Sequence, residues 1–260
     1  MSRLLASNLS RVRKNVFFWI SLLCATINPL YTVINNWYYK VHWDSPLYAD
    51  EPFVLIGSHY IFVIVLAVTI SLYIGTEYGD KTIRNKLIAG HSRLSVYLTN
   101  LLTSVIIAVA MYFAGVIGAC LGLPLLGGIV LPTEKFILQM GFAALSVSAI
   151  AAVICTVSML IGNRVIGAIA SLLVTIGLHA LPPVLRSDIW FLTDMGMLDS
   201  FRAKMDLLLY DLLPTCQLYQ YTSQFEDIPK NIYFFPIYSI LIIVLFGFVG
   251  AMCFRKKNLN

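Results

Sequence analysis

The stretch VYLTNLLTSVIIAVAMYFAGVIGACL, residues 96–121, decides the fold class. Its 26 residues contain no Lys, Arg, Asp or Glu. An α-helix rises about 1.5 Å per residue, so about 20 mostly apolar residues cross the hydrocarbon core of a bilayer. The stretch is therefore long enough to cross a membrane as one helix, and it predicts an integral membrane protein.

Five more stretches of the same kind lie on either side of this one. They are residues 16–34, 53–74, 136–161, 165–181 and 233–254, and none contains a charged side chain. Only 12% of the 260 residues are charged, whereas a soluble domain has about 25%. We therefore predict an all-α integral membrane protein with six transmembrane helices, built as one membrane domain over residues 1–260. Because Pro182 and Pro183 follow the fifth stretch, we expect them to kink or end that helix.

The basic residues lie on one side of the predicted membrane. If the N-terminus is inside, the inner segments hold 12 of the 18 basic residues and two of the 13 acidic ones. Loops on the cytoplasmic side of membrane proteins are enriched in Lys and Arg. Both termini are therefore expected in the cytoplasm. The net charge of +5 fits this orientation in lipid better than binding to nucleic acid.

Two segments outside the spans have a helical pattern. Residues 2–14 place Leu5, Leu9 and Val12 at helical spacing among basic residues, which is typical of an amphipathic helix in the membrane interface. The long outer segment, residues 186–232, contains a second pattern from Phe201 to Leu212. Its apolar side chains recur every three or four residues, whereas Asp206 and Asp211 take the other face. This second helix is expected to rest either on the outer leaflet or on the bundle.

The most informative loop, residues 75–95, is the only long inner one. It contains EYGDKTIRNKLIAGHSR, residues 77–93, and this motif resembles the permease subunits of type-two ABC exporters. Those subunits typically carry an acidic residue, then Gly-x-x-Thr-Ile-Arg-Asn-Lys-Leu, a small turn and Ser-Arg. The sequence LPTCQ, residues 213–217, is similar to the Leu-Pro-x-x-Gln often found before their last span.

The resemblance implies a permease that a separate ATPase drives. In that family the loop forms a short coupling helix that docks in a groove of the ATPase. The matching positions are Thr82, Ile83, Arg84, Asn85, Lys86 and Leu87. Ile83 and Leu87 lie four residues apart and could form an apolar face for the partner, while Arg84 and Lys86 could pair with its acids. Alternatively, these cations serve only the orientation in the membrane.

Glu77 is the only glutamate on the inner side. We expect it to bond to the loop backbone, to pair with Arg84 or Lys81, or to remain solvated. Three polar residues lie within the predicted spans, namely Asn28, His59 and His179. Polar groups inside a membrane often mark a substrate path, although they can also serve packing or a kink.

The chain shows no sequence motif for catalysis. It has no Gly-Lys dipeptide, and so no Walker A loop for ATP phosphates. Its four histidines lack zinc-ligand spacing, and no Gly-x-Ser-x-Gly elbow occurs. We expect no enzymatic activity and no cofactor on this chain, with ATP and Mg²⁺ bound to the partner ATPase.

The sequence and this resemblance thus predict an exporter permease of a bacterial cell membrane, working as a homodimer or together with a similar permease. Its substrate would be hydrophobic or amphipathic, such as an antimicrobial peptide. The alternative is a membrane-bound peptide sensor or immunity protein that does not transport.

Overall fold

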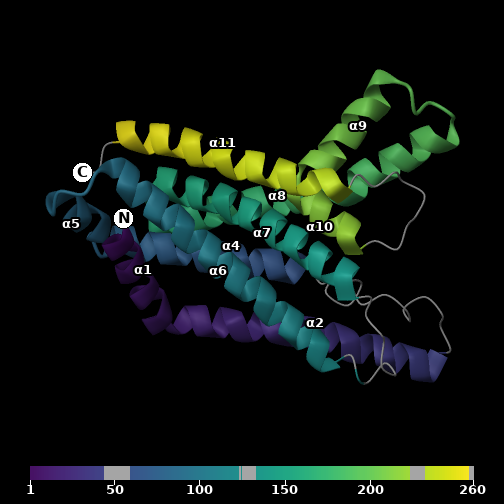
Figure 1. Ribbon diagram of the computed structural model, residues 1–260, viewed down its shortest axis with the longest axis horizontal. Helices are drawn as coiled ribbons and strands as arrows, with labels where there is room; N and C mark the ends of the chain where they lie inside the picture. The colour runs from purple at the N-terminus through teal and green to yellow at the C-terminus, as the bar shows by residue number, and fades with distance from the viewer. Residues whose placement is uncertain (44–58, 123, 125–132, 223–231, 258–260) are drawn as a thin grey trace.

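The computed structural model describes residues 1–43, 59–122, 124, 133–222 and 232–257, and these residues contain α-helices and no strand. Six helices are long and apolar enough to cross a membrane, which confirms the predicted fold class. They are α2 (Val16–Trp43), α4 (His59–Gly79), α6 (Arg93–Gly122), α7 (Thr133–Ile161), α8 (Arg164–Asp194) and α11 (Phe235–Lys256). Figure 1 shows them side by side in one bundle.

Shorter helices lie at the two ends of this bundle. Helix α1 (Ser2–Lys14) and helix α5 (Thr82–Ile88) lie at the end that also holds the last residues of α11, and we call it the terminal end (Figure 1). Helix α9 (Phe201–Leu212) and helix α10 (Pro214–Thr222) lie at the opposite, distal end. A 3-10 turn, η3 (Ile232–Phe234), leads into α11.

The central helix is α7, which packs against α4, α6, α8, α10 and α11. By contrast, α2, α8 and α11 are mostly exposed along their apolar windows, as expected of helices that face lipid. The glycines of α6 bring it close to α2. A Cβ on Gly118 would collide with the carbonyl of Thr26, and one on Gly122 would lie 2.7 Å from Val33. These small residues therefore serve packing within one chain.

The second span differs from its predicted limits. Helix α4 begins at His59, while residues 53–58 lie outside the described part of the chain, and it continues to Gly79. Glu77 therefore lies inside the helix rather than in a loop after it. A carboxylate can end an apolar pattern without ending a helix when the fold supplies its partners.

The fifth span also runs further than predicted, because α8 continues through Pro182 and Pro183 to Asp194. A proline inside a helix leaves the carbonyl four residues earlier without its usual N–H donor. For Pro182 that carbonyl belongs to Leu178, and the Thr215 hydroxyl of α10 donates to it over 2.8 Å. A side chain from the distal end thus replaces the lost hydrogen bond, and the helix does not end at the prolines.

The predicted helix in the long outer segment is confirmed as α9, with the Ser200 side chain accepting from the Ala203 N–H. Its apolar row does not rest on the bundle, which was one of its two expected positions, while the other position, on the outer leaflet, stays a prediction. Phe201 and Leu208 on its apolar side are exposed, whereas Asp211 is buried. Helix α9 therefore packs on the bundle through its other face.

The LPTCQ sequence anchors α10 inside the bundle. Gln217 is fully buried, and its Oε1 accepts hydrogen bonds of 2.7 Å from Ser146 on α7 and Ser239 on α11. Its Nε2 donates to the carbonyls of Asp211 and Leu212. One side chain thus holds α7, α11 and the end of α9 together.

Candidate coupling site

The loop between α4 and α6 is built around two tight turns. The Thr82 hydroxyl donates to the Glu77 carbonyl over 2.9 Å at the first turn. The second turn ends α5 at Gly90, which has a positive φ of 87°. There the His91 N–H bonds to the Lys86 carbonyl and the Gly90 N–H to the Leu87 carbonyl. This paired arrangement is a Schellman motif, for which glycine is the favoured residue.

The Glu77 side chain is fully buried at the terminal end of the bundle. Its Oε1 accepts from Arg11 Nη1 at 2.8 Å and from Lys86 Nζ at 2.8 Å. Its Oε2 accepts from Lys86 Nζ at 2.6 Å and from Asn100 Nδ2 at 3.3 Å. A carboxylate on α4 is thus bound by side chains from α1, α5 and α6.

Asn8 of α1 extends this network. Its Oδ1 accepts from Lys86 Nζ at 2.8 Å, and its Nδ2 donates to Asn100 Oδ1 at 2.8 Å. We call Asn8, Arg11, Glu77, Lys86 and Asn100 the Glu77 cluster. A lysine ammonium has three N–H donors, and Lys86 has three acceptor atoms within the cluster.

The cluster holds two cations and one carboxylate, and Asp80 beside it supplies the second negative charge. Arg11 and Lys86 share Glu77, and Arg11 also contacts Asp80 at 3.2 Å. Burial lowers the pKa of Lys86, while the charge of Glu77 acts in the opposite direction. Removing one member of a buried ion pair is strongly destabilising, because the remaining charge has lost its partner. The positions of α1, α4 and α5 are therefore energetically linked.

This geometry corrects two sequence-based expectations. Ile83 is 2% exposed and belongs to the chain's own apolar core, and Leu87 packs beside it. These two side chains therefore do not form an outward apolar face. Glu77 pairs with Arg11 and Lys86, not with Arg84 or Lys81. For Ile83 and Leu87 the nearest apolar surface is the bundle of their own chain, and for Lys86 the nearest buried acid is Glu77 in that same bundle.

The outward side of α5 consists of Arg84, Asn85 and Ile88, and Ile88 is 75% exposed. The motif thus divides into two sets of residues. Thr82, Ile83 and Lys86 serve the fold, with Leu87 partly buried next to them. The role of the motif in binding a partner stays a prediction, but Arg84, Asn85 and Ile88 are the side chains available for it.

Sequence reasoning missed three residues of the cluster, namely Asn8, Arg11 and Asn100. Two of them had a signal. Asn8 lies between Leu4 and Val12 at four-residue spacing, and these three form the buried face of α1, rather than the predicted face through Leu5 and Leu9. Asn100 is a strongly polar side chain inside an apolar run, and such residues need partners within the protein.

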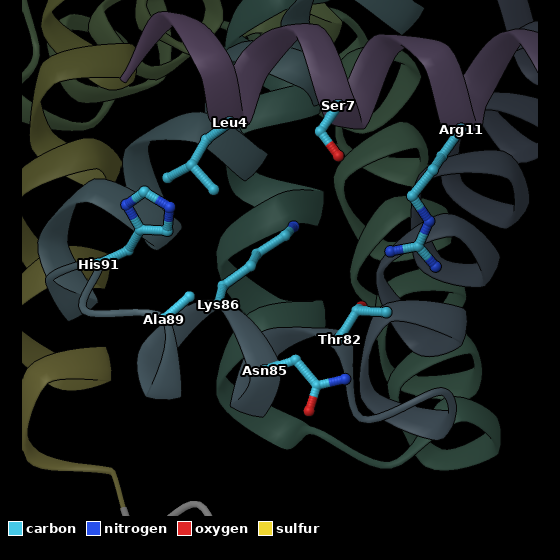
Figure 2. Close-up of a pocket in the computed structure, with 8 residues that line it drawn as sticks. All are labelled: Leu4, Ser7, Arg11, Thr82, Asn85, Lys86, Ala89 and His91. Carbon is cyan, nitrogen blue, oxygen red and sulfur yellow. The ribbon is translucent and has the colours of Figure 1, made fainter.

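An open groove of about 420 Å³ separates α1 from α5. Figure 2 shows Leu4, Ser7 and Arg11 of α1 facing Lys86 and the other side chains of α5 and its following turn. The full lining is Leu4, Ser7, Arg11, Thr82, Asn85, Lys86, Ala89 and His91. The groove is mixed in character, because its lining combines the apolar Leu4 and Ala89 with the cations Arg11 and Lys86.

The C-terminal residues are bound at the same end of the bundle. Arg93, from the Ser-Arg of the motif, donates to the carbonyls of Arg255 and Lys257 at 2.9 and 2.6 Å. Lys257 Nζ donates to the Met159 carbonyl at 2.9 Å and to the Tyr78 hydroxyl at 3.1 Å. Burial lowers the pKa of Lys257 to about 8.

The three residues predicted to mark a substrate path lie on three different helices, and none of them belongs to the Glu77 cluster. Asn28 is half-buried on α2, next to Pro29. His179 is buried on α8, in line with Ser171 and Thr175. His59 begins α4, but its side chain lies outside the described residues. Among the residues whose positions are described, no group of His, Cys, Asp or Glu could hold a metal ion.

Six apolar helices, with a short helix held against them by a buried ion-pair cluster, define a helical integral membrane protein. The chain belongs to the ABC-2 family, because the model for ABC-2 family transporter proteins matches residues 4–178. That match extends from α1 into α8 and includes the whole Glu77 cluster. The protein is therefore a permease subunit of an ABC transporter. No curated protein matches the sequence.

Proposed function

We propose that this permease exports a hydrophobic or amphipathic substrate, with antimicrobial peptides as the leading class. A separate ABC ATPase would dock on the outward side of α5 and supply the energy. In this proposal the terminal end faces the cytoplasm of a bacterial cell, two permeases form a homodimer, and ATP and Mg²⁺ bind to the ATPase.

The observation that carries the proposal is the two-sided nature of α5. Its inward side is fixed to α1, α4 and α6 through the Glu77 cluster, and its outward side presents Arg84, Asn85 and Ile88. A partner bound to the outward side would thus act directly on helices that cross the membrane. The partner is expected to present an acidic side chain to Arg84 and, next to it, an apolar pocket to Ile88.

The test is transport in reconstituted vesicles. The permease would be reconstituted together with an ABC ATPase sought among the genes next to its own, and the movement of a labelled amphipathic peptide would be followed after addition of ATP. We expect ATP-dependent movement away from the side that carries the ATPase. Movement toward the ATPase would contradict export, and failure of that ATPase to bind the permease would contradict the proposed partnership.

One observation favours the alternative of a peptide sensor or immunity protein. Phe201, Met205, Leu208 and Leu209 form an exposed apolar row on α9 at the distal end, and such a row could hold an amphipathic peptide without moving it. The same vesicles separate the two functions. A sensor would bind the labelled peptide equally with and without ATP and would move none of it.

A further inference from the structure

The acidic residue and the lysine of the loop motif are partners of each other. Glu77 and Lys86 lie nine positions apart, on either side of the turn at Lys81, and their side chains meet at 2.6 Å. Lys86 has no donor left for a protein outside the chain, because Asn8 and both oxygens of Glu77 are within hydrogen-bonding distance of its Nζ.

The position of Lys86 on α5, where it meets Glu77 of α4, determines which side of α5 faces outward. Adjacent residues of an α-helix are about 100° apart around its axis. Fixing Lys86 toward Glu77 therefore turns Ile83 into the core and leaves Arg84 and Ile88 outside, as observed. The seven residues of α5 are too few to hold a helical conformation without tertiary contacts, so those contacts must fix its rotation.

Two further bonds extend the effect to α1. Arg11 reaches the same carboxylate at 2.8 Å, and Asn8 reaches Lys86 at 2.8 Å. If Glu77 were absent, α1 and α5 would lose their common attachment to α4. Asn100 would still connect Asn8 to α6, so α1 would keep part of its support, whereas Lys86 would keep only Asn8.

We infer that Glu77 is a positioning residue, which fixes the rotation of α5 and makes α1 and α5 move as one body with α4 and α6. Lys86 is reserved for this internal contact, and Arg84 and Ile88 are the residues left for a partner. The inference rests on the proposed function only for the identity of that partner. The orientation of α5 is a property of the permease alone.

The test measures cysteine accessibility in the purified permease without any ATPase. In a background without the five native cysteines, Ile83→Cys and Ile88→Cys each place a single thiol on one side of α5. The rate at which a water-soluble maleimide labels each thiol in detergent reports how exposed that side is. Ile150, which is 1% exposed on α7, becomes a third reporter as Ile150→Cys, because it reacts only if the bundle itself opens. We expect fast labelling at position 88 and slow labelling at positions 83 and 150.

The variants then remove the pair in steps. Lys86→Met should raise labelling at position 83 by about tenfold or more, because a buried carboxylate loses a charged partner. Lys86→Arg should retain the protection. Adding Glu77→Gln to Lys86→Met removes the unbalanced charge, and Arg11 keeps its contact with Asp80. The contact between positions 77 and 86 is still missing, however, so position 83 should stay labelled about as fast as in Lys86→Met while position 150 stays protected. Lys81→Met, the same change at an exposed lysine of the same loop, should have no effect.

If Lys86→Met also exposes position 150, the double variant decides, because it carries no unbalanced buried charge that could open the bundle. Protection at position 150 together with fast labelling at position 83 supports the inference. A double variant that protects position 83 as the parent does would overturn it, as would unchanged protection in every variant. Co-purification of the parent permease with the ATPase is measured separately, so a failure there counts against the proposed function and not against the role of Glu77.

Discussion

Replacing Gln217 should loosen the distal end of the bundle. The change Gln217→Met keeps the length of the side chain but removes its hydrogen bonds to Ser146, Ser239 and two backbone carbonyls of the α9 end. Each buried hydrogen bond contributes about 0.6–1 kcal/mol in membrane and soluble proteins. Four of them together predict a loss of about 2–4 kcal/mol in the free energy of unfolding.

The assay is reversible unfolding in mixed micelles, followed by circular dichroism at increasing fractions of a denaturing detergent. In Ser146→Ala the Gln217 Oε1 keeps its 2.7 Å hydrogen bond from Ser239, so this change alone should cost less than about 1.5 kcal/mol. A Gln217→Met variant that unfolds within about 0.5 kcal/mol of the parent, a difference typical of neutral surface changes, would refute this reasoning about the LPTCQ sequence.

Three more perturbations have defined outcomes. Gly118→Leu should prevent α6 from approaching α2, because any Cβ there meets the Thr26 carbonyl, and the unfolding free energy should fall by about 3 kcal/mol or more. Thr215→Val should remove the donor to the Leu178 carbonyl inside α8, at a cost of about 1–3 kcal/mol in the same assay. Lys257 has a pKa lowered to about 8, so above pH 8 the unfolded chain holds a proton that the folded chain has released. Stability should therefore rise with pH above about 8, and Lys257→Met should remove that part of the rise.

Each of these changes has a matched control. Gly141 has open space where a Cβ would lie, so Gly141→Leu should be nearly neutral, and an equal loss in both glycine variants would contradict the packing argument. Thr193 donates to a carbonyl of its own helix, so Thr193→Val should cost less than Thr215→Val. Lys256→Met should leave the pH dependence unchanged, because Lys256 shares the helix end but is exposed.

The sequence predicted the six spans well, because charge and apolar length report directly where a helix can be solvated by lipid. It also predicted the helix α9 from the periodicity of its apolar residues. Its errors concern the ends of helices and the direction of their faces. Helix α4 includes Glu77, and α8 includes Pro182, because partners distant in the sequence satisfy a carboxylate and a carbonyl that appear unsatisfied along the chain.

The rotation of α5 is the clearest example of what periodicity cannot determine. Ile83 and Leu87 do define one apolar side of α5, as the pattern indicated. Whether such a side faces a partner or the same chain depends on which apolar surface is nearest, and the structure places Ile83 in its own core. The pairing of Glu77 with Arg11 depends on α1 folding back onto α6, which brings together side chains 66 positions apart and which no local pattern encodes.

We propose that a partner ATPase docks on the outward side of α5, and the effect of Ile88→Asp tests this docking most directly. Ile88 is exposed and lies outside the buried core, so the variant should insert into the membrane and unfold like the parent. It should nevertheless lose co-purification with the ATPase and peptide-stimulated ATP hydrolysis, because docking would bury an unpaired carboxylate. The matched change Met197→Asp, at an exposed residue of the distal end, should retain both activities. An Ile88→Asp permease that binds the ATPase and stimulates hydrolysis as the parent does would contradict the account.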